Sequence, residues 1–184
     1  MNKTLLSAAL IAGFGVAALA PQAANASDGT VTFAGKVTAS TCTINVGTTS
    51  GGSSSTVTLP TVDVASLSAA GKVAAPTPFS IYLTACTFAN AGNVGVYFEP
   101  GANTQTDGNL KNTAATNNVE IQLLNSTQGV MTLNSASGAQ NGTTAAVTTS
   151  STSATLNYYA QYYATAAATA GTVGSSVTYS VVYP

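Results

Sequence analysis

Few side chains in this sequence are equipped for covalent or metal chemistry. Cys42 and Cys86 carry the only thiols, and histidine is absent. A nucleophilic thiolate needs a basic partner, and a zinc site needs more soft ligands than two thiols provide. An even number of cysteines in an exported chain favours a disulfide, and a loop of this length gains roughly 4 kcal/mol in the chain-entropy model.

The carboxylates and serines offer little for catalysis. Glu99 and Glu120 could in principle form the pair of a glycosidase, but no motif surrounds them, and we expect exposed loop or strand-edge positions. The run Asp107-Gly108-Asn109 is typical of a turn and lacks the ligand spacing of a calcium loop. Ser53–Ser55 lacks the glycines of a nucleophile elbow. We therefore predict a chain that is not an enzyme, with no catalytic residue, metal ligand or cofactor site.

Four tyrosines near the C-terminal end could stack on sugar rings, which makes a secreted carbohydrate-binding sandwich an alternative function. Alternate residues of a strand point to opposite faces, so Tyr158 and Tyr162 share one face while Tyr159 and Tyr163 share the other. We expect one pair to lie in the core and the other on the surface or in a subunit contact.

The first 26 residues have the features of a secretory signal. Lys3 is followed by an apolar run from Leu5 to Ala20 and then by the small-residue site Ala24-Asn25-Ala26. The run is shorter than the roughly 20 apolar residues of a membrane span. We expect cleavage of residues 1–26 and a mature chain that begins near Ser27 and forms one domain.

Charge is scarce in the expected mature chain, which keeps three lysines and five carboxylates. Such a surface has no basic patch for phosphates, so nucleic-acid binding is excluded as a function class. Weak electrostatic repulsion between copies suits a protein that packs against itself, although a neutral monomeric domain has the same composition.

Short alternating segments separated by turn-rich stretches predict an all-β antiparallel sandwich. A membrane barrel would need longer strands and more of them. One helical turn is expected at Val64–Ala70, with Asp63 as its cap and Gly71 as its stop, whereas residues 164–170 are expected to form a loop. The expected strands after the first 40 residues are Thr56–Leu59, Phe79–Ala85, Val94–Phe98, Val119–Leu124, Val130–Leu133, Ala145–Thr149, Thr155–Ala164 and Val173–Tyr183.

The two ends of the mature chain pose complementary problems. The last segment places Val173, Val177, Tyr179, Val181 and Tyr183 on one face, interrupted by Ser175, and we expect its outer edge to lack a partner strand within the chain. The N-terminal segment places Val31, Phe33, Gly35 and Val37 on one face, and nine residues of it span about 30 Å when extended. The segment is either the first strand of its own domain or a strand added to another chain.

Several motifs, in this order behind a signal peptide, resemble the major subunits of chaperone–usher fimbriae, such as type 1 pilins. The resemblance covers the whole mature chain. It is carried by the segment Gly29–Val37 followed by Cys42, by the strand Pro78–Cys86, by the aromatic strand Tyr158–Thr165, and by an ending with Gly171 and the penultimate Tyr183. The chain departs from the family pattern at Ser175 and at the final Pro184.

This resemblance implies an incomplete immunoglobulin-like (pilin) sandwich at 41–184 that is completed by the donor strand of a neighbouring subunit. Residues 27–40 would be the donor extension, with Val31, Phe33, Gly35 and Val37 as donor positions. The acceptor edge and chaperone-binding surface would comprise Gly171, Val173, Val177, Tyr179, Val181 and Tyr183, and Cys42 would pair with Cys86.

The implied partners are identical or homologous subunits, a periplasmic chaperone, an outer-membrane usher and, through the assembled fimbria, a host or surface glycan. The implied route leads through the periplasm to the cell surface, and the implied role is that of a structural subunit that supports adhesion. The size of the mature chain leaves no room for a separate lectin domain, which argues for a shaft subunit over a tip adhesin.

Overall fold

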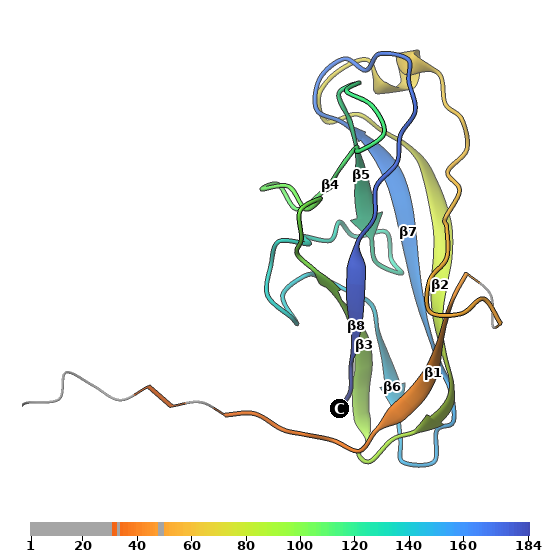
Figure 1. Ribbon diagram of the computed structural model, residues 1–184, viewed down its shortest axis with the longest axis vertical. Helices are drawn as coiled ribbons and strands as arrows, with labels where there is room; N and C mark the ends of the chain where they lie inside the picture. Colours follow the sequence, from red (N-terminus) through yellow and green to blue (C-terminus); the bar gives the residue numbers. More distant parts are fainter. Residues whose placement is uncertain (1–30, 33, 48–49) are drawn as a thin grey trace, which may run out of the picture. The chain divides into compact units, whose positions relative to one another are not determined.

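The structure, a computed structural model, describes residues 31–32, 34–47 and 50–184. The chain divides into two compact units, Met1–Lys36 and Val37–Pro184, and the strands formed by the described residues all lie in the second (Figure 1). The expected signal segment 1–26 lies outside the described residues, as does Phe33. The described residues between Val31 and Ser40 carry no strand.

The second unit is a sandwich of two antiparallel sheets, as the sequence predicts. The larger sheet has the order β1-β2-β7-β5-β4 and the smaller has the order β6-β3-β8, so that β8 is an edge strand. Figure 1 shows the long strands β2 and β7 side by side, with β8 alongside β3. The strands are β1 (Thr41–Val46), β2 (Val73–Thr87), β3 (Gly92–Glu99), β4 (Leu110–Lys111), β5 (Val119–Leu124), β6 (Thr144–Val147), β7 (Ala154–Ala164) and β8 (Thr178–Val182).

The core forms because alternate residues of β2, β3 and β7 point inward from both sheets. Tyr158 is fully buried at its centre, where its ring stacks on Phe79 at 5.6 Å between centroids and meets Phe98 edge-on at 5.3 Å. Apolar burial of this kind contributes about 25 cal/mol per Å². Tyr162, on the same face, packs against a smaller cluster around Leu67, but like Tyr159 and Tyr163 it is only partly buried. The expectation that one same-face pair lies in the core therefore holds for Tyr158 alone, and the four side chains do not form one stacking surface.

A disulfide joins β1 to β2 through Cys42 and Cys86, as predicted. The bond lies where the β1–β2 register shifts, between the pairs Thr41–Thr87 and Thr43–Thr84. It therefore fixes the first strand of the domain close to the point at which the N-terminal extension begins.

Four of the expected elements are wrong or shorter than expected. Thr56–Leu59 and Val130–Leu133 are not strands, because the first has no neighbouring strand to pair with and the second forms only one isolated bridge, from Val130 to Leu124. The last strand begins at Thr178 instead of Val173. The expected helix is a single 3-10 turn, η1 (Val64–Leu67), although the Asp63 carboxylate caps it by accepting the N–H of Ala65 at 2.8 Å.

An acidic pair lies at the edge of the larger sheet. The amide nitrogen of Asn109 donates to Asp107 at 2.8 Å and to Glu120 at 3.1 Å, and Asn109 in turn accepts a hydrogen bond from Gln122. Burial raises the pKa of Glu120, and the nearby Asp107 carboxylate raises it further, against the lowering effect of the Asn109 hydrogen bond. The strand neighbours of Glu120 are Lys111 and Tyr163.

The raised pKa of Glu120 predicts that the folded domain loses stability as the pH rises through the pKa that this carboxyl has in the folded state. The folded state binds the Glu120 proton more tightly than the unfolded state does, so the stabilising contribution is complete below the unfolded pKa, near 4.5, and disappears above the folded pKa. We expect Glu120→Gln to raise the free energy of unfolding at pH 7 and to leave it nearly unchanged at pH 4. Urea denaturation at both pH values measures this, with Glu99→Gln as the control; equal effects of the two variants at pH 7 would contradict the assignment.

A candidate strand-acceptor groove

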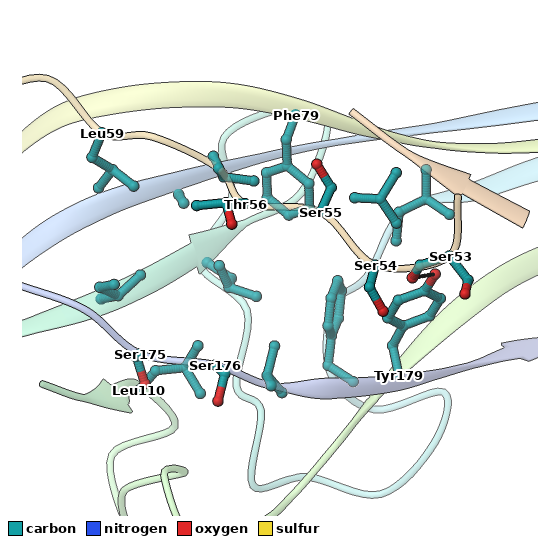
Figure 2. Close-up of a pocket in the computed structure, with 18 residues that line it drawn as sticks. Ser53, Ser54, Ser55, Thr56, Leu59, Phe79, Leu110, Ser175, Ser176 and Tyr179 are labelled. Atoms are coloured by element: carbon teal, nitrogen blue, oxygen red, sulfur yellow. Dashed lines mark hydrogen bonds between the residues drawn. The ribbon is translucent and has the colours of Figure 1, made fainter. Parts of the chain in front are cut away.

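A groove of about 400 Å³ runs along the free edge of β8 into the core. In Figure 2, one wall is the segment that carries Ser53, Ser54, Ser55, Thr56 and Leu59, and the facing wall carries Ser175, Ser176 and Tyr179. The floor is apolar and comes from both sheets, through Phe79, Ile81, Phe98, Leu110, Ile121, Leu123 and Ala160. The groove is therefore a long apolar slot between two stretches of backbone.

Both walls of the groove offer unpaired backbone. β8 is paired with β3 alone, so its other edge faces the groove. Within the described part of the chain, the backbone of residues 54–62 makes no hydrogen bond. Residues 54–62 are mostly exposed in the single chain, whereas backbone N–H and C=O groups that become buried are almost always paired in native structures. Two facing stretches of unpaired backbone over an apolar floor are the two sides of a slot for one more strand.

Ser175 gives a second sign that the groove lacks a partner. Its Oγ atom is buried, yet it makes no hydrogen bond to any described residue. A buried hydroxyl without a partner costs about 1–3 kcal/mol, and native proteins rarely tolerate one without a reason. Ser175 lines the groove, so a strand placed there could supply the missing partner.

The two walls are tied together at one end of the groove. The Tyr179 hydroxyl donates to the carbonyl oxygen of Ser53 at 2.8 Å, and the Tyr179 ring lies 6.3 Å from that of Phe98. Burial raises the pKa of the Tyr179 hydroxyl, so it stays protonated and able to donate at neutral pH. The Tyr183 ring packs near Phe88, also at 6.3 Å.

Asparagine side chains hold the segment that precedes β8. The Asn112 amide is buried and makes four hydrogen bonds, accepting N–H groups from Ala114 and Gly174 and donating to Thr172 and Asn117. Nearer to β8, the Asn103 amide donates to the carbonyl oxygen of Ser176 at 3.0 Å. These amides take the place of a neighbouring strand and keep residues 172–176 extended.

The structure brings only part of the predicted acceptor edge to the groove. Val177 and Tyr179 line it, and Val181 and Tyr183 pack on the main core. Val173 packs in the small cluster around Leu67, and Gly171 is exposed beside Asn117.

The sequence analysis did not predict that Ser53–Leu59 forms one wall of the groove, that residues of both sheets form its floor, or that asparagines hold the segment before β8. The asparagines at 103, 112 and 117 could have been noticed as turn formers, but their contacts depend on the tertiary fold.

The two glutamates considered as a catalytic pair lie on different sheets, Glu99 on β3 and Glu120 on β5. Glu99 accepts hydrogen bonds from Thr178 and Ser180 on β8. Among the described residues, no group of three or more potential metal ligands occurs. In the same part of the chain, none of the helical segments is long and apolar enough to cross a membrane.

Comparison with known proteins identifies a family for most of the chain. The family model described as "Type-1 fimbrial protein, A" matches residues 59–184. The chain is 51% identical over 149 residues to the "Major fimbrial subunit SMF-1" of Stenotrophomonas maltophilia (strain K279a), a match that covers 78% of this chain and 85% of that protein. It is 46% identical over 155 residues to the "F17 fimbrial protein" of Escherichia coli, covering 79% and 83% of the two chains.

Solved structures show the same fold at low sequence identity. A subunit in the structure of a chaperone–usher pilus matches with a TM-score of 0.56 at 19% identity, covering 90% of this chain and all of that one. The P pilus rod subunit PapA matches with a TM-score of 0.53 at 16% identity, covering 71% and 93%. The chain therefore belongs to the type-1 fimbrial protein family, whose members are structural subunits of surface pili and not enzymes.

Proposed function

We propose that the groove along β8 receives the N-terminal segment of another copy of this chain, so that copies polymerise into a fimbrial rod. The observation that carries this proposal is the pair of facing unpaired backbones, β8 and residues 54–62, across an apolar floor. One inserted strand forms ladders with both walls and removes the edge that otherwise invites aggregation.

The segment with the right length and pattern is residues 27–40. Val31 and Val37 are exposed, at 76% and 99%, and belong to no strand. Burying Val31, Phe33 and Val37 on the groove floor contributes roughly 1.5–3 kcal/mol each before the cost of ordering the segment. Gly35, which has no side chain, permits close approach of the two backbones. Once inserted, the strand leaves only when a whole ladder breaks, so the polymer is stable kinetically.

Assembly needs an orderly supply of unpolymerised subunits. In our proposal residues 1–26 direct export and are removed, the Cys42–Cys86 bond forms in the oxidising periplasm, and residues 41–184 fold around a strand lent by a periplasmic chaperone. The acceptor edge comprises Gly171, Val173, Val177, Tyr179, Val181 and Tyr183. At an outer-membrane usher, the extension of the next subunit replaces the chaperone strand. The assembled fimbria then presents many copies to a host or surface glycan and supports adhesion.

Donor-strand insertion predicts that a peptide of residues 27–37 stabilises the chain trimmed to residues 38–184. We expect a cooperative thermal transition, raised in temperature by the peptide, because the peptide buries three apolar side chains and pairs both walls. Circular dichroism of the trimmed, oxidised chain with and without peptide measures this. The matched control is the same peptide with Val31, Phe33 and Val37 replaced by serine. A trimmed chain that melts cooperatively at an unchanged temperature with either peptide would show that the sandwich is complete by itself.

The asparagine contacts at the acceptor edge predict a separate effect on donor binding. Asn112→Ala removes two hydrogen bonds that hold Thr172 and Gly174 and two more to Ala114 and Asn117, and each buried group left unpaired costs about 1–3 kcal/mol. We expect weaker binding of the 27–37 peptide, by about tenfold for each 1.4 kcal/mol lost, measured by titration calorimetry. Asn134→Ala, which removes one exposed hydrogen bond to Thr106, is the control. Equal affinity in both variants would mean that Asn112 does not prepare the edge.

A further inference from the structure

The direction in which a donor strand lies in the groove decides where the rest of its subunit sits. All strand pairs in this fold are antiparallel, and antiparallel pairing is slightly the more stable kind. Of the two walls β8 is the one that forms a regular strand, and a donor antiparallel to it runs from the Tyr179 end of the groove toward the Ser175 end, parallel to residues 53–59 on the other wall (Figure 2). Its residue 37 then emerges beside Gly174, where Thr113 and Ala114 form the rim.

Very little chain separates the donor strand from its own domain. β1 begins at Thr41, and Ser40 is already fixed: it is buried, and its Oγ accepts the N–H of Ala89 at 2.9 Å. Thr38 and Ser40 also hydrogen-bond to each other through their hydroxyls at 3.0 Å. Only Thr38 and Ala39 remain between Val37 and this anchor, and the three steps from residue 37 to residue 40 span about 11 Å at most. The two subunits must therefore touch.

The two surfaces brought together are compatible in chemistry. On the accepting copy they are the loop 112–117 and the segment 171–176, which hydrogen bonds through Asn112 and Thr113 hold together. On the donating copy they are the turns 87–93 and 148–153 around the anchored Ser40, linked by the hydrogen bond from Cys86 to Thr152. None of these four segments contains a charged side chain, so none of their own side chains needs to lose a hydrated charge where they meet.

We propose that these two ends form a stiff joint between successive copies, in which Ser40 fixes the angle at which each subunit leaves its donor strand and loop 112–117 is the surface it rests on. This inference rests on the proposed strand insertion but goes further. Strand insertion alone requires only that the N-terminal segment can reach the groove of another copy. The joint adds that the bending stiffness of the rod depends on Ser40 and on the rim at Ala114.

The test uses filaments of the full mature chain, imaged by electron microscopy. Strand insertion is measured independently on a detergent gel, where oligomers joined by inserted strands resist dissociation and appear as a series of bands, called here the oligomer ladder. Ser40→Ala should leave the oligomer ladder intact and reduce the persistence length of the filaments by about twofold or more, because the joint gains freedom. Ser137→Ala is the matched control, since Ser137 is exposed and its side chain makes no hydrogen bond within the described residues. Unchanged stiffness in Ser40→Ala filaments overturns the role of the anchor.

A charge pair tests the location of the joint without touching the anchor. Ala39→Glu combined with Ala114→Glu should destabilise or loosen the filament, and Ala39→Lys combined with Ala114→Glu should restore it, because both alanines are exposed in the single chain and meet only across the joint. Ala39→Glu combined with Ala136→Glu, at an exposed alanine outside the four segments of the joint, should behave like the parent. Equal behaviour of the Glu/Glu and Lys/Glu filaments overturns the location, whereas loss of the oligomer ladder in the parent chain itself overturns strand insertion and the joint together.

Discussion

The unpaired backbone of β8 and of residues 54–62 is the constraint on which the rest of the structure depends. A sandwich normally closes its core by pairing every inner strand, because burying an unpaired backbone group away from water costs about as much as a lost hydrogen bond. Here the gap runs the length of the groove and exposes part of the apolar floor. The domain is therefore built to be finished by a strand that is not part of it, and polymerisation follows from the same deficit.

Several features keep the gap open in a form that a strand can enter. The asparagines at 103 and 112 hold residues 172–176 extended, and the Tyr179–Ser53 hydrogen bond sets the separation of the walls at one end. The disulfide fixes β1 to β2 near the start of the extension. Each of these features costs the isolated subunit little, yet each lowers the ordering cost of the incoming strand, which is the general benefit of preorganisation in binding.

The sequence was sufficient for the sandwich and the disulfide, because alternation with period two and cysteine count report directly on burial and covalent pairing. For the four tyrosines it was right only in part, since Tyr158 is buried in the core but Tyr162 on the same face is not. It failed at Thr56–Leu59, where the alternation is real but no partner strand lies within reach, and a strand is defined by its partner. It also failed to place the groove, since Phe79, Ile121 and Leu59 look like ordinary core residues until the two sheets are assembled. The buried amide of Asn112 had no sequence signal, because its four partners come from residues up to 62 positions away.

The most direct measurement of strand insertion is amide hydrogen exchange of the mature chain, compared between unpolymerised subunit and assembled filament. The account predicts that amides in residues 54–62, and those of 175–183 that do not pair with β3, exchange rapidly in the subunit and become strongly protected in the filament, together with residues 30–37. Protection that appears only at the loops 112–117 and 148–153, with residues 54–62 still exchanging freely, would contradict it, because copies would then associate by surface contact without filling the groove.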